Sequence, residues 1–250
     1  MKPYTIDPSQ LSLEEFRELT AGKSMLPGRI TLQEKIRERF HVLKQSGVNT
    51  LGDLLRLLAS KSNIECFADQ SGLPAAYLVL LKREAGSYLA RPFPLSEFPG
   101  IPFEYVELLK SRGIRNTRDF FEQVQTGKQQ KDLSLNTGIP VYRLEELYSL
   151  CDLSRITGVG GIFARVLYEA GVSSTREFAS MDVASLLRSC RAVIEKHGYA
   201  AAKPGEQDIQ YGIGYSLVII KCDRKSEVWY LYQPEESRLP EPARIEGPRP

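Results

Sequence analysis

The chain has 250 residues, of which 42% are hydrophobic and 26% charged, and its formal net charge at pH 7 is +2. These values are those of an ordinary soluble globular protein that forms one or two domains. The near balance of charge excludes a polyanion-binding surface over the whole molecule, so any nucleic-acid site has to be a local basic patch.

The four cysteines and two histidines are too scattered to form a zinc site. Cys66, Cys151, Cys190 and Cys222 contain no C-x-x-C pair and are expected to be free thiols in a reducing compartment. The first ten residues lack the apolar core of a signal peptide, and no apolar run approaches the ~20 residues that cross a bilayer. We therefore expect a cytoplasmic protein that binds no metal, no cofactor and no membrane.

In chain order, the local signals divide the sequence into five parts. Residues 1–28 are expected to form an N-terminal helical extension, and residues 29–90 a first unit of short helices. Residues 95–198 contain a second and a third unit, after a proline-rich break. Residues 199–232 are expected to form a linker and a small β-hairpin, and residues 233–250 a disordered tail.

A glycine turn recurs at Gly47, Gly113 and Gly171, and such internal repetition indicates stacked supersecondary units. The glycine stands where a helix ends in the left-handed conformation, and an aliphatic residue follows it. Three residues after each glycine comes a helix cap, and an acid follows three residues later. The cap and acid pairs are Thr50 and Asp53, Asn116 and Asp119, and Ser174 and Glu177.

A second hairpin type alternates with the first and reads glycine, aliphatic, then proline or glycine. It covers residues 72–74, 100–102, 138–140 and 158–160. Proline at this point suits the start of a helix, because its fixed φ is helical and its missing N–H has no acceptor there. Apolar residues at helical spacing follow every copy, whereas the polar residues 126–131 are expected to form a surface loop or a fraying helix end.

The sequence changes character after Gly198. Residues 215–222 are β-branched and apolar, and residues 227–232 are aromatic with high strand propensity. A short polar turn separates the two stretches, which predicts a β-hairpin. The expected fold is thus mainly α, with tandem hairpin units and a small C-terminal β-hairpin.

Residues 153–178 resemble a helix-hairpin-helix motif. The match consists of Leu153 and Ile156, then Gly158-Val159-Gly160, then Ala164-Arg165, then Gly171-Val172. The array over residues 40–190 also resembles a bacterial domain-of-unknown-function family that is distantly similar to helix-hairpin-helix proteins. These resemblances imply that the α-helical part is built of tandem helix-hairpin-helix-like repeats.

DNA-binding members of the helix-hairpin-helix superfamily contact a phosphate at the Gly-x-Gly hairpin. The resemblance therefore implies a phosphate contact at residues Gly158, Val159, Gly160 and Gly161, with Arg165 adding a charge. Two glycines let the backbone come close to a phosphate, and the next helix adds its free N–H groups and its positive dipole end. Such contacts carry no direct sequence information. The alternative is that this hairpin only connects two helices tightly.

The other three hairpins depart from this pattern. Their second glycine is replaced by Pro74, Pro102 or Pro140, which removes an N–H donor. The residues that match Arg165 are Val79, Glu107 and Glu145, and the carboxylates would repel a phosphate. We expect only the last hairpin to be competent for phosphate.

A second candidate site is a run of four cations around the middle glycine turn. It consists of Lys110, Arg112, Arg115 and Arg118. Such a cluster suits the phosphate backbone of a nucleic acid. The alternative is a set of ordinary solvated charges on helix faces.

No catalytic or cofactor motif accompanies His41 or His197, so we expect no enzymatic activity and no catalytic residue. The leading hypothesis is sequence-nonspecific nucleic-acid binding to the DNA backbone, through the Gly-x-Gly hairpin. The alternative is a protein-interaction scaffold in which the repeats are purely structural. In that case the C-terminal β-hairpin or the helical faces would dock a protein partner.

Overall fold

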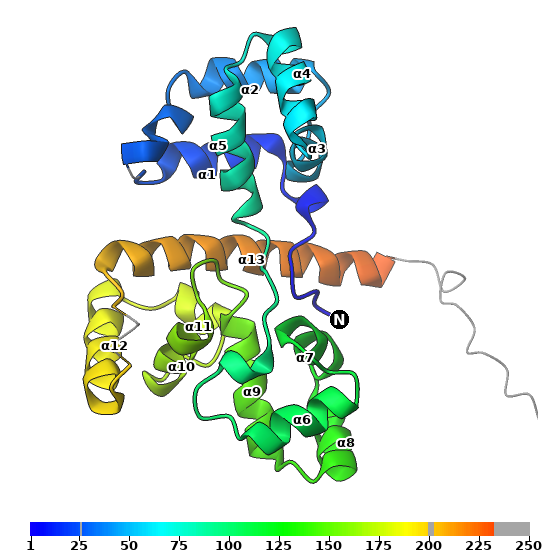
Figure 1. Cartoon of the computed structure of the whole chain (residues 1–250), viewed down its shortest axis with the longest axis vertical. Coiled ribbons are helices and arrows are strands. Elements are labelled where there is room, and N and C mark those ends of the chain that lie inside the picture. Colours follow the sequence, from blue (N-terminus) through cyan, green and yellow to red (C-terminus); the bar gives the residue numbers. More distant parts are fainter. Residues whose placement is uncertain (26, 200–202, 233–250) are drawn as a thin grey trace, which may run out of the picture.

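The computed structural model describes residues 1–25, 27–199 and 203–232. These residues form two helical lobes, and the long helix α13 (Glu206–Tyr232) crosses between them (Figure 1). In these ranges, β-structure is limited to two isolated bridges, Ser12 with Thr50 and Pro94 with Asn116. The prediction of a mainly α fold is confirmed.

The first lobe contains the helices up to α5, and the second lobe those from α6 to α12 (Figure 1). In the first lobe these are η1 (Pro8–Gln10), α1 (Leu13–Gly22), η2 (Pro27–Leu32), α2 (Ile36–Gln45), α3 (Leu51–Leu57), α4 (Lys61–Ser71) and α5 (Ala75–Gly86). In the second lobe they are η3 (Leu95–Glu97), α6 (Phe103–Ser111), α7 (Thr117–Gln123), α8 (Gly127–Thr137), α9 (Val141–Leu153), α10 (Gly161–Glu169), α11 (Thr175–Ala179) and α12 (Val183–His197).

The repeated glycine turns have the predicted geometry. Gly47, Gly113 and Gly171 have φ angles of 85°, 82° and 91°, in the left-handed region that favours glycine. The predicted caps accept hydrogen bonds from the backbone N–H groups of the acids three residues later, at Thr50, Asn116 and Ser174. The turn chemistry in the sequence therefore fixes where α3, α7 and α11 begin.

The expected C-terminal β-hairpin is not found, because residues 215–232 belong to α13. Tyr215, Val218, Ile219 and Cys222 are buried, and they recur at the spacing of one helix face. Helix α13 packs on α11 and α12 of the second lobe, and Tyr215 contacts Lys23 and Tyr88 of the first lobe. Burial between the two lobes therefore overrides the strand propensity of valine and isoleucine. Residues 200–202 of the expected linker and the tail at 233–250 lie outside the described residues.

The polar segment at 126–131 forms the capped start of α8, where the sequence predicts a surface loop or a fraying helix end. The Thr126 hydroxyl accepts a hydrogen bond from the Gln129 N–H, and the Gln129 side chain accepts one from the Thr126 N–H. This reciprocal capping box starts α8 in spite of its low apolar content. No helix in the described ranges is long and apolar enough to span a membrane.

The contact between α1 and α13 predicts an acid-sensitive stability. Burial disfavours the charged form of Glu15, but hydrogen bonds from Lys221 and Ser12 outweigh it and lower the pKa of Glu15 to about 2 from 4.5. A depressed pKa in the folded state adds stability above the unfolded pKa, and this is lost as the pH falls from about 4.5 to 2. Over this range we expect urea-unfolding midpoints to fall more steeply for the wild type than for Glu15→Gln. Parallel pH profiles would contradict the expectation.

Candidate nucleic-acid interface

The Gly158 hairpin exposes an unpaired stretch of backbone. Gly158 has a φ of 88° and is exposed, as is Gly160, whereas Val159 between them is buried and anchors the turn. Helix α10 begins at Gly161 with no side-chain cap. In the described part of the chain, the N–H groups of residues 160–163 have no backbone or side-chain acceptor. Such a helix start is suited to an anion.

The three sister hairpins differ in the way that the sequence predicts. Pro74, Pro102 and Pro140 immediately precede the first residues of α5, α6 and α9. Their φ angles are −60°, −58° and −57°, close to the value that the proline ring imposes. Each proline removes the N–H group that Gly160 keeps. The Gly158 hairpin is therefore the only one of the four with this donor.

Gly161 is required for packing between units. A Cβ atom at this position would lie 2.3 Å from the Glu97 carbonyl oxygen, which is too close for any side chain. The end of η3, just before the second hairpin, therefore packs directly on the start of α10. Gly161 serves this contact, whereas Gly160 has open space around it.

Replacing Gly161 with alanine is expected to lower the free energy of unfolding by about 1–3 kcal/mol, because two backbone segments must separate. Gly127 is a matched control, since it is the first residue of α8 and a Cβ there meets no atom within 4 Å. Gly127→Ala should leave stability unchanged or slightly raise it. Equal urea-unfolding midpoints for the two variants would contradict this expectation.

Arg165 is placed differently from the expectation of an outward-facing charge. Its side chain is 5% exposed and forms an ion pair with Glu146 at 2.5 Å. Its Nε donates to the Pro99 carbonyl oxygen at 2.8 Å. The buried Nη2 has no hydrogen-bond partner within the described ranges and is the closest atom to a Cβ built on Gly100. Arg165 thus joins α10 to α9 and to the second hairpin.

The four predicted cations around Gly113 are all exposed, at the end of α6 and the start of α7. Arg112 donates to the Asn136 carbonyl oxygen at 2.6 Å, and Lys110 forms an exposed ion pair with Glu107 at 3.4 Å. Arg118 donates to the Thr5 hydroxyl, whereas the Arg115 side chain forms no hydrogen bond or ion pair with the described residues. None of the four lines the hollows at the Gly158 hairpin. The structure does not bring the two predicted sites together.

A different set of cations faces the hairpin. A hollow of about 890 Å³ lies between the lobes, with residues 158–160 on one wall and α4 and α5 on the other. We call it the basic hollow, because cationic side chains line it and no acidic residue of the described ranges does. The cations are Arg29, Lys61, Lys82, Arg83, Arg91 and Arg155. Arg83 and Arg91 are exposed and have no ion-pair partner among the described residues.

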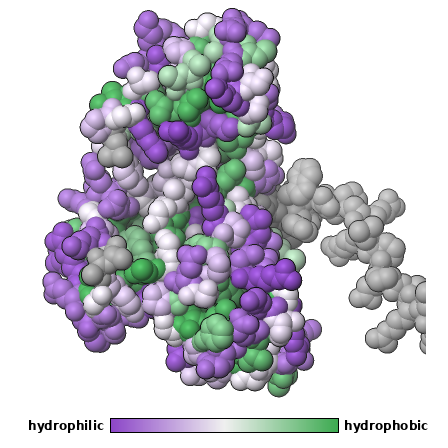
Figure 2. All heavy atoms as spheres, in the orientation of Figure 1, coloured by the Kyte–Doolittle hydropathy of each residue, from purple (hydrophilic) through white to green (hydrophobic). Residues whose placement is uncertain are grey.

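A second hollow of about 600 Å³ lies on the other side of the hairpin, against α13. It shares Arg29, Thr157, Gly158 and Val159 with the basic hollow, so the two meet at the hairpin. We call it the tyrosine hollow, after Tyr211 and Tyr215 in its lining. On the face of the molecule that Figure 2 shows, hydrophilic and hydrophobic residues are mixed.

A buried ion cluster joins the first lobe to α13 beside these hollows. The Glu84 carboxylate is fully buried and pairs with Lys23 at 2.7 Å and with Arg29 at 2.8 Å. Lys23 also donates to the Tyr215 hydroxyl of α13 at 2.7 Å. The Ser87 carbonyl oxygen, one turn after Glu84, accepts a hydrogen bond from Thr157 of the hairpin. The hairpin is thereby tied to the first lobe.

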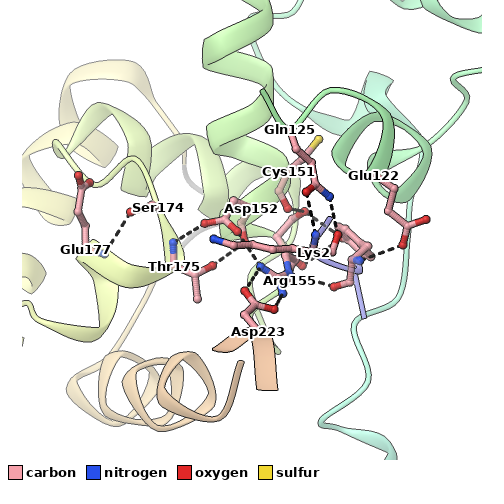
Figure 3. A network of polar contacts seen from close by, with 12 residues as sticks. Lys2, Glu122, Gln125, Cys151, Asp152, Arg155, Ser174, Thr175, Glu177 and Asp223 are labelled. Carbon is pink, nitrogen blue, oxygen red and sulfur yellow. Dashed lines mark hydrogen bonds and ion pairs between the residues drawn. The ribbon is translucent and has the colours of Figure 1, made fainter. Parts of the chain in front are cut away.

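A second network fixes the segment that leads into the hairpin (Figure 3). Arg155 is 2% exposed and pairs with Asp152 at 2.9 Å and with Asp223 of α13 at 2.6 Å. Its Nε donates to the Tyr4 carbonyl oxygen at 3.1 Å. Asp152 in turn accepts a hydrogen bond from the Thr175 N–H at the start of α11. One guanidinium therefore links the N-terminal segment, α9, α11 and α13 beside the hairpin.

Residues 99–215 match the family model described as Domain of unknown function (DUF4332). The match runs from the second hairpin through most of the second lobe into α13, and it includes the Gly158 hairpin. No curated protein matches the chain, and no solved structure does. The predicted resemblance to a domain-of-unknown-function family is confirmed for this region, whereas the wider helix-hairpin-helix resemblance stays a prediction.

The sequence alone does not indicate that cations of the first lobe face the hairpin. Lys82, Arg83 and Arg91 lie far from Gly158 in the sequence, and only the packing of the lobes brings them together. The occurrence of these three cations within ten residues is only a weak sequence indication of a basic surface. Among the described residues, no group of three or more His, Cys, Asp or Glu side chains is placed to hold a metal ion.

Proposed function

We propose that this protein binds nucleic acid through its phosphate backbone, without sequence specificity, at the Gly158 hairpin. The free N–H groups of residues 160–163 would hold a phosphate at the positive end of α10. Arg83 and Arg91 would add charge from the opposite wall of the basic hollow. The single observation that carries the proposal is this pairing of free backbone donors with a hollow lined by cations.

Arg165 has a structural role in this proposal. It holds the second hairpin against α10 and so fixes the direction in which the N–H groups point. We infer a binding protein and not an enzyme, because the proposed contacts position a backbone and carry no reacting group. The cytoplasmic location stays a prediction from the sequence.

The test is the binding of fluorescein-labelled oligonucleotides, single-stranded and duplex, followed by fluorescence anisotropy across a salt series. Phosphate contacts release counterions, so log K should fall linearly with log salt, by about 0.7–0.9 for each contact. We expect measurable affinity at about 50 mM salt and a loss of at least tenfold by about 200 mM. An absence of binding to either nucleic acid at low salt would refute the proposal.

A scaffold role is the second candidate, because large apolar side chains are exposed on the second lobe. Leu135, Phe103 and Tyr142 are 86%, 68% and 61% exposed. Leu135 and Tyr142 flank the third hairpin, a position that suits a protein partner, and a second copy of the chain is the first partner to test. If the chain associates with itself in this way, analytical sedimentation should show a dimer for the wild type. The double variant Leu135→Ser with Tyr142→Ser should then sediment as a monomer. A wild-type monomer at high concentration would count against self-association.

A further inference from the structure

The surroundings of the Gly158 hairpin restrict how a nucleic acid can reach it. The Thr157 hydroxyl donates to the Ser87 carbonyl oxygen, so the hairpin is tied to the first lobe, while Gly158 and Gly160 remain exposed. Gly158 lines both the basic hollow and the tyrosine hollow. A phosphate that occupies either hollow at the hairpin therefore lies between the hairpin and the first lobe.

The two hollows are too small for a double helix. Their volumes are about 890 Å³ and about 600 Å³, within the range of about 300–1,000 Å³ that encloses a small molecule. The major groove of B-DNA alone is about 12 Å wide, and a duplex presents two backbones at once. A single strand presents one backbone and places only a few nucleotides in such a space.

The lining of the basic hollow also suits unpaired bases. Its cations lie together with apolar side chains, whereas a surface that reads only phosphates needs charge alone. The apolar residues of this lining that are not fully buried are Leu55, Val79, Leu89, Ala90 and Phe93. Phe93 is half-buried and is an aromatic ring in this lining. The unstacked faces of bases bind to apolar and aromatic surfaces, whereas in a duplex they are hidden in the stack.

The geometry points to single-stranded nucleic acid as the ligand. We infer that a strand passes between the lobes, with a phosphate on the N–H groups of residues 160–163, a second phosphate near Arg83 and Arg91, and a base on the apolar lining. This inference rests on the proposed function and narrows its substrate class. The shared lining of the two hollows gives the strand a path across the hairpin.

The experiment compares fluorescein-labelled oligo(dT) with a duplex of the same length, on the full chain, by anisotropy at low salt. We expect the single strand to bind at least about tenfold more tightly. The double variant Arg83→Gln with Arg91→Gln removes two proposed contacts, so its salt slope for oligo(dT) should fall by about 0.7 for each contact. Phe93→Ala should weaken oligo(dT) binding and leave the slope unchanged, because it removes a base contact only.

The matched control is Lys110→Gln with Arg115→Gln, which removes two exposed cations that line neither hollow. It should leave the salt slope for oligo(dT) within error of the wild type. Equal affinity for duplex, or an equal loss of slope in the control variant, would overturn the single-strand inference while nucleic-acid binding stands. No binding of either probe would overturn the proposed function itself. Circular dichroism of each variant confirms that the helices are retained.

Discussion

Replacing Arg155 with methionine is expected to lower the free energy of unfolding by about 3–5 kcal/mol, because it leaves buried carboxylates without their partner. Asp223 would lose both of its bonds to the guanidinium, and the Tyr4 carbonyl oxygen would lose a donor. Methionine keeps most of the apolar stem, so the loss reports the polar contacts more than the volume. Urea unfolding followed by circular dichroism measures it.

Two further variants make the Arg155 result specific. Arg191→Met removes an exposed arginine from α12 and should change stability by less than about 0.5 kcal/mol. Adding Asp223→Leu to Arg155→Met removes the stranded carboxylate and should recover part of the loss. If Arg155→Met were no more destabilising than Arg191→Met, the network in Figure 3 would not hold the N-terminal segment, α9 and α13 together.

Replacing Glu84 with glutamine is expected to cost about 3 kcal/mol, since Lys23 and Arg29 would then face each other without a counter-charge. Lys23 is largely buried, and its ammonium lies 4.3 Å from the centroid of the Tyr215 ring. The Tyr215 ring can still stabilise the Lys23 ammonium when Glu84 is replaced. We therefore expect a smaller loss of stability than for Arg155→Met. Glutamine preserves the shape, so the change isolates the charge.

The Glu84 cluster joins the first lobe to Tyr215 of α13 beside the Gly158 hairpin, so this variant should also affect the site. We expect weaker oligo(dT) binding at protein concentrations and temperatures where the variant remains folded. Glu145→Gln is the control, because Glu145 is exposed on α9 and forms no ion pair with the described residues. A Glu84→Gln protein with wild-type stability would contradict the role of the cluster.

The sequence predicts the repeat architecture well because its signals are local. Each left-handed glycine and each cap is set by residues within one turn of it, as at Gly113 and Asn116. The C-terminal helix could not be predicted in the same way. The residues from Tyr215 to Cys222 combine strand propensity with helical spacing, and only their burial between the two lobes decides between a strand and a helix.

The candidate site was predictable in part for the same reason. The glycines of the Gly158 hairpin stand out because three sister hairpins have proline at the matching position. The burial of Arg165 was not predictable, since its partners Glu146 and Pro99 belong to other elements. The residues on the opposite wall of the basic hollow are even more distant from Gly158 in the sequence. Their position beside the hairpin depends on how the two lobes pack, which the sequence does not show.

The most direct test is the affinity of Gly160→Pro for oligo(dT) at low salt. Gly160 has a φ of −84° and open space around it, and its N–H has no acceptor in the described ranges, so proline should fit as it does in the sister hairpins. Gly160→Ala keeps the N–H and serves as the control.

We expect wild-type helical content and thermal stability in both variants. The proline variant should bind at least about tenfold more weakly than the alanine variant, because it loses a charge-assisted hydrogen bond worth about 1.5–3 kcal/mol. Equal affinities of the two variants would contradict the claim that this hairpin holds a phosphate.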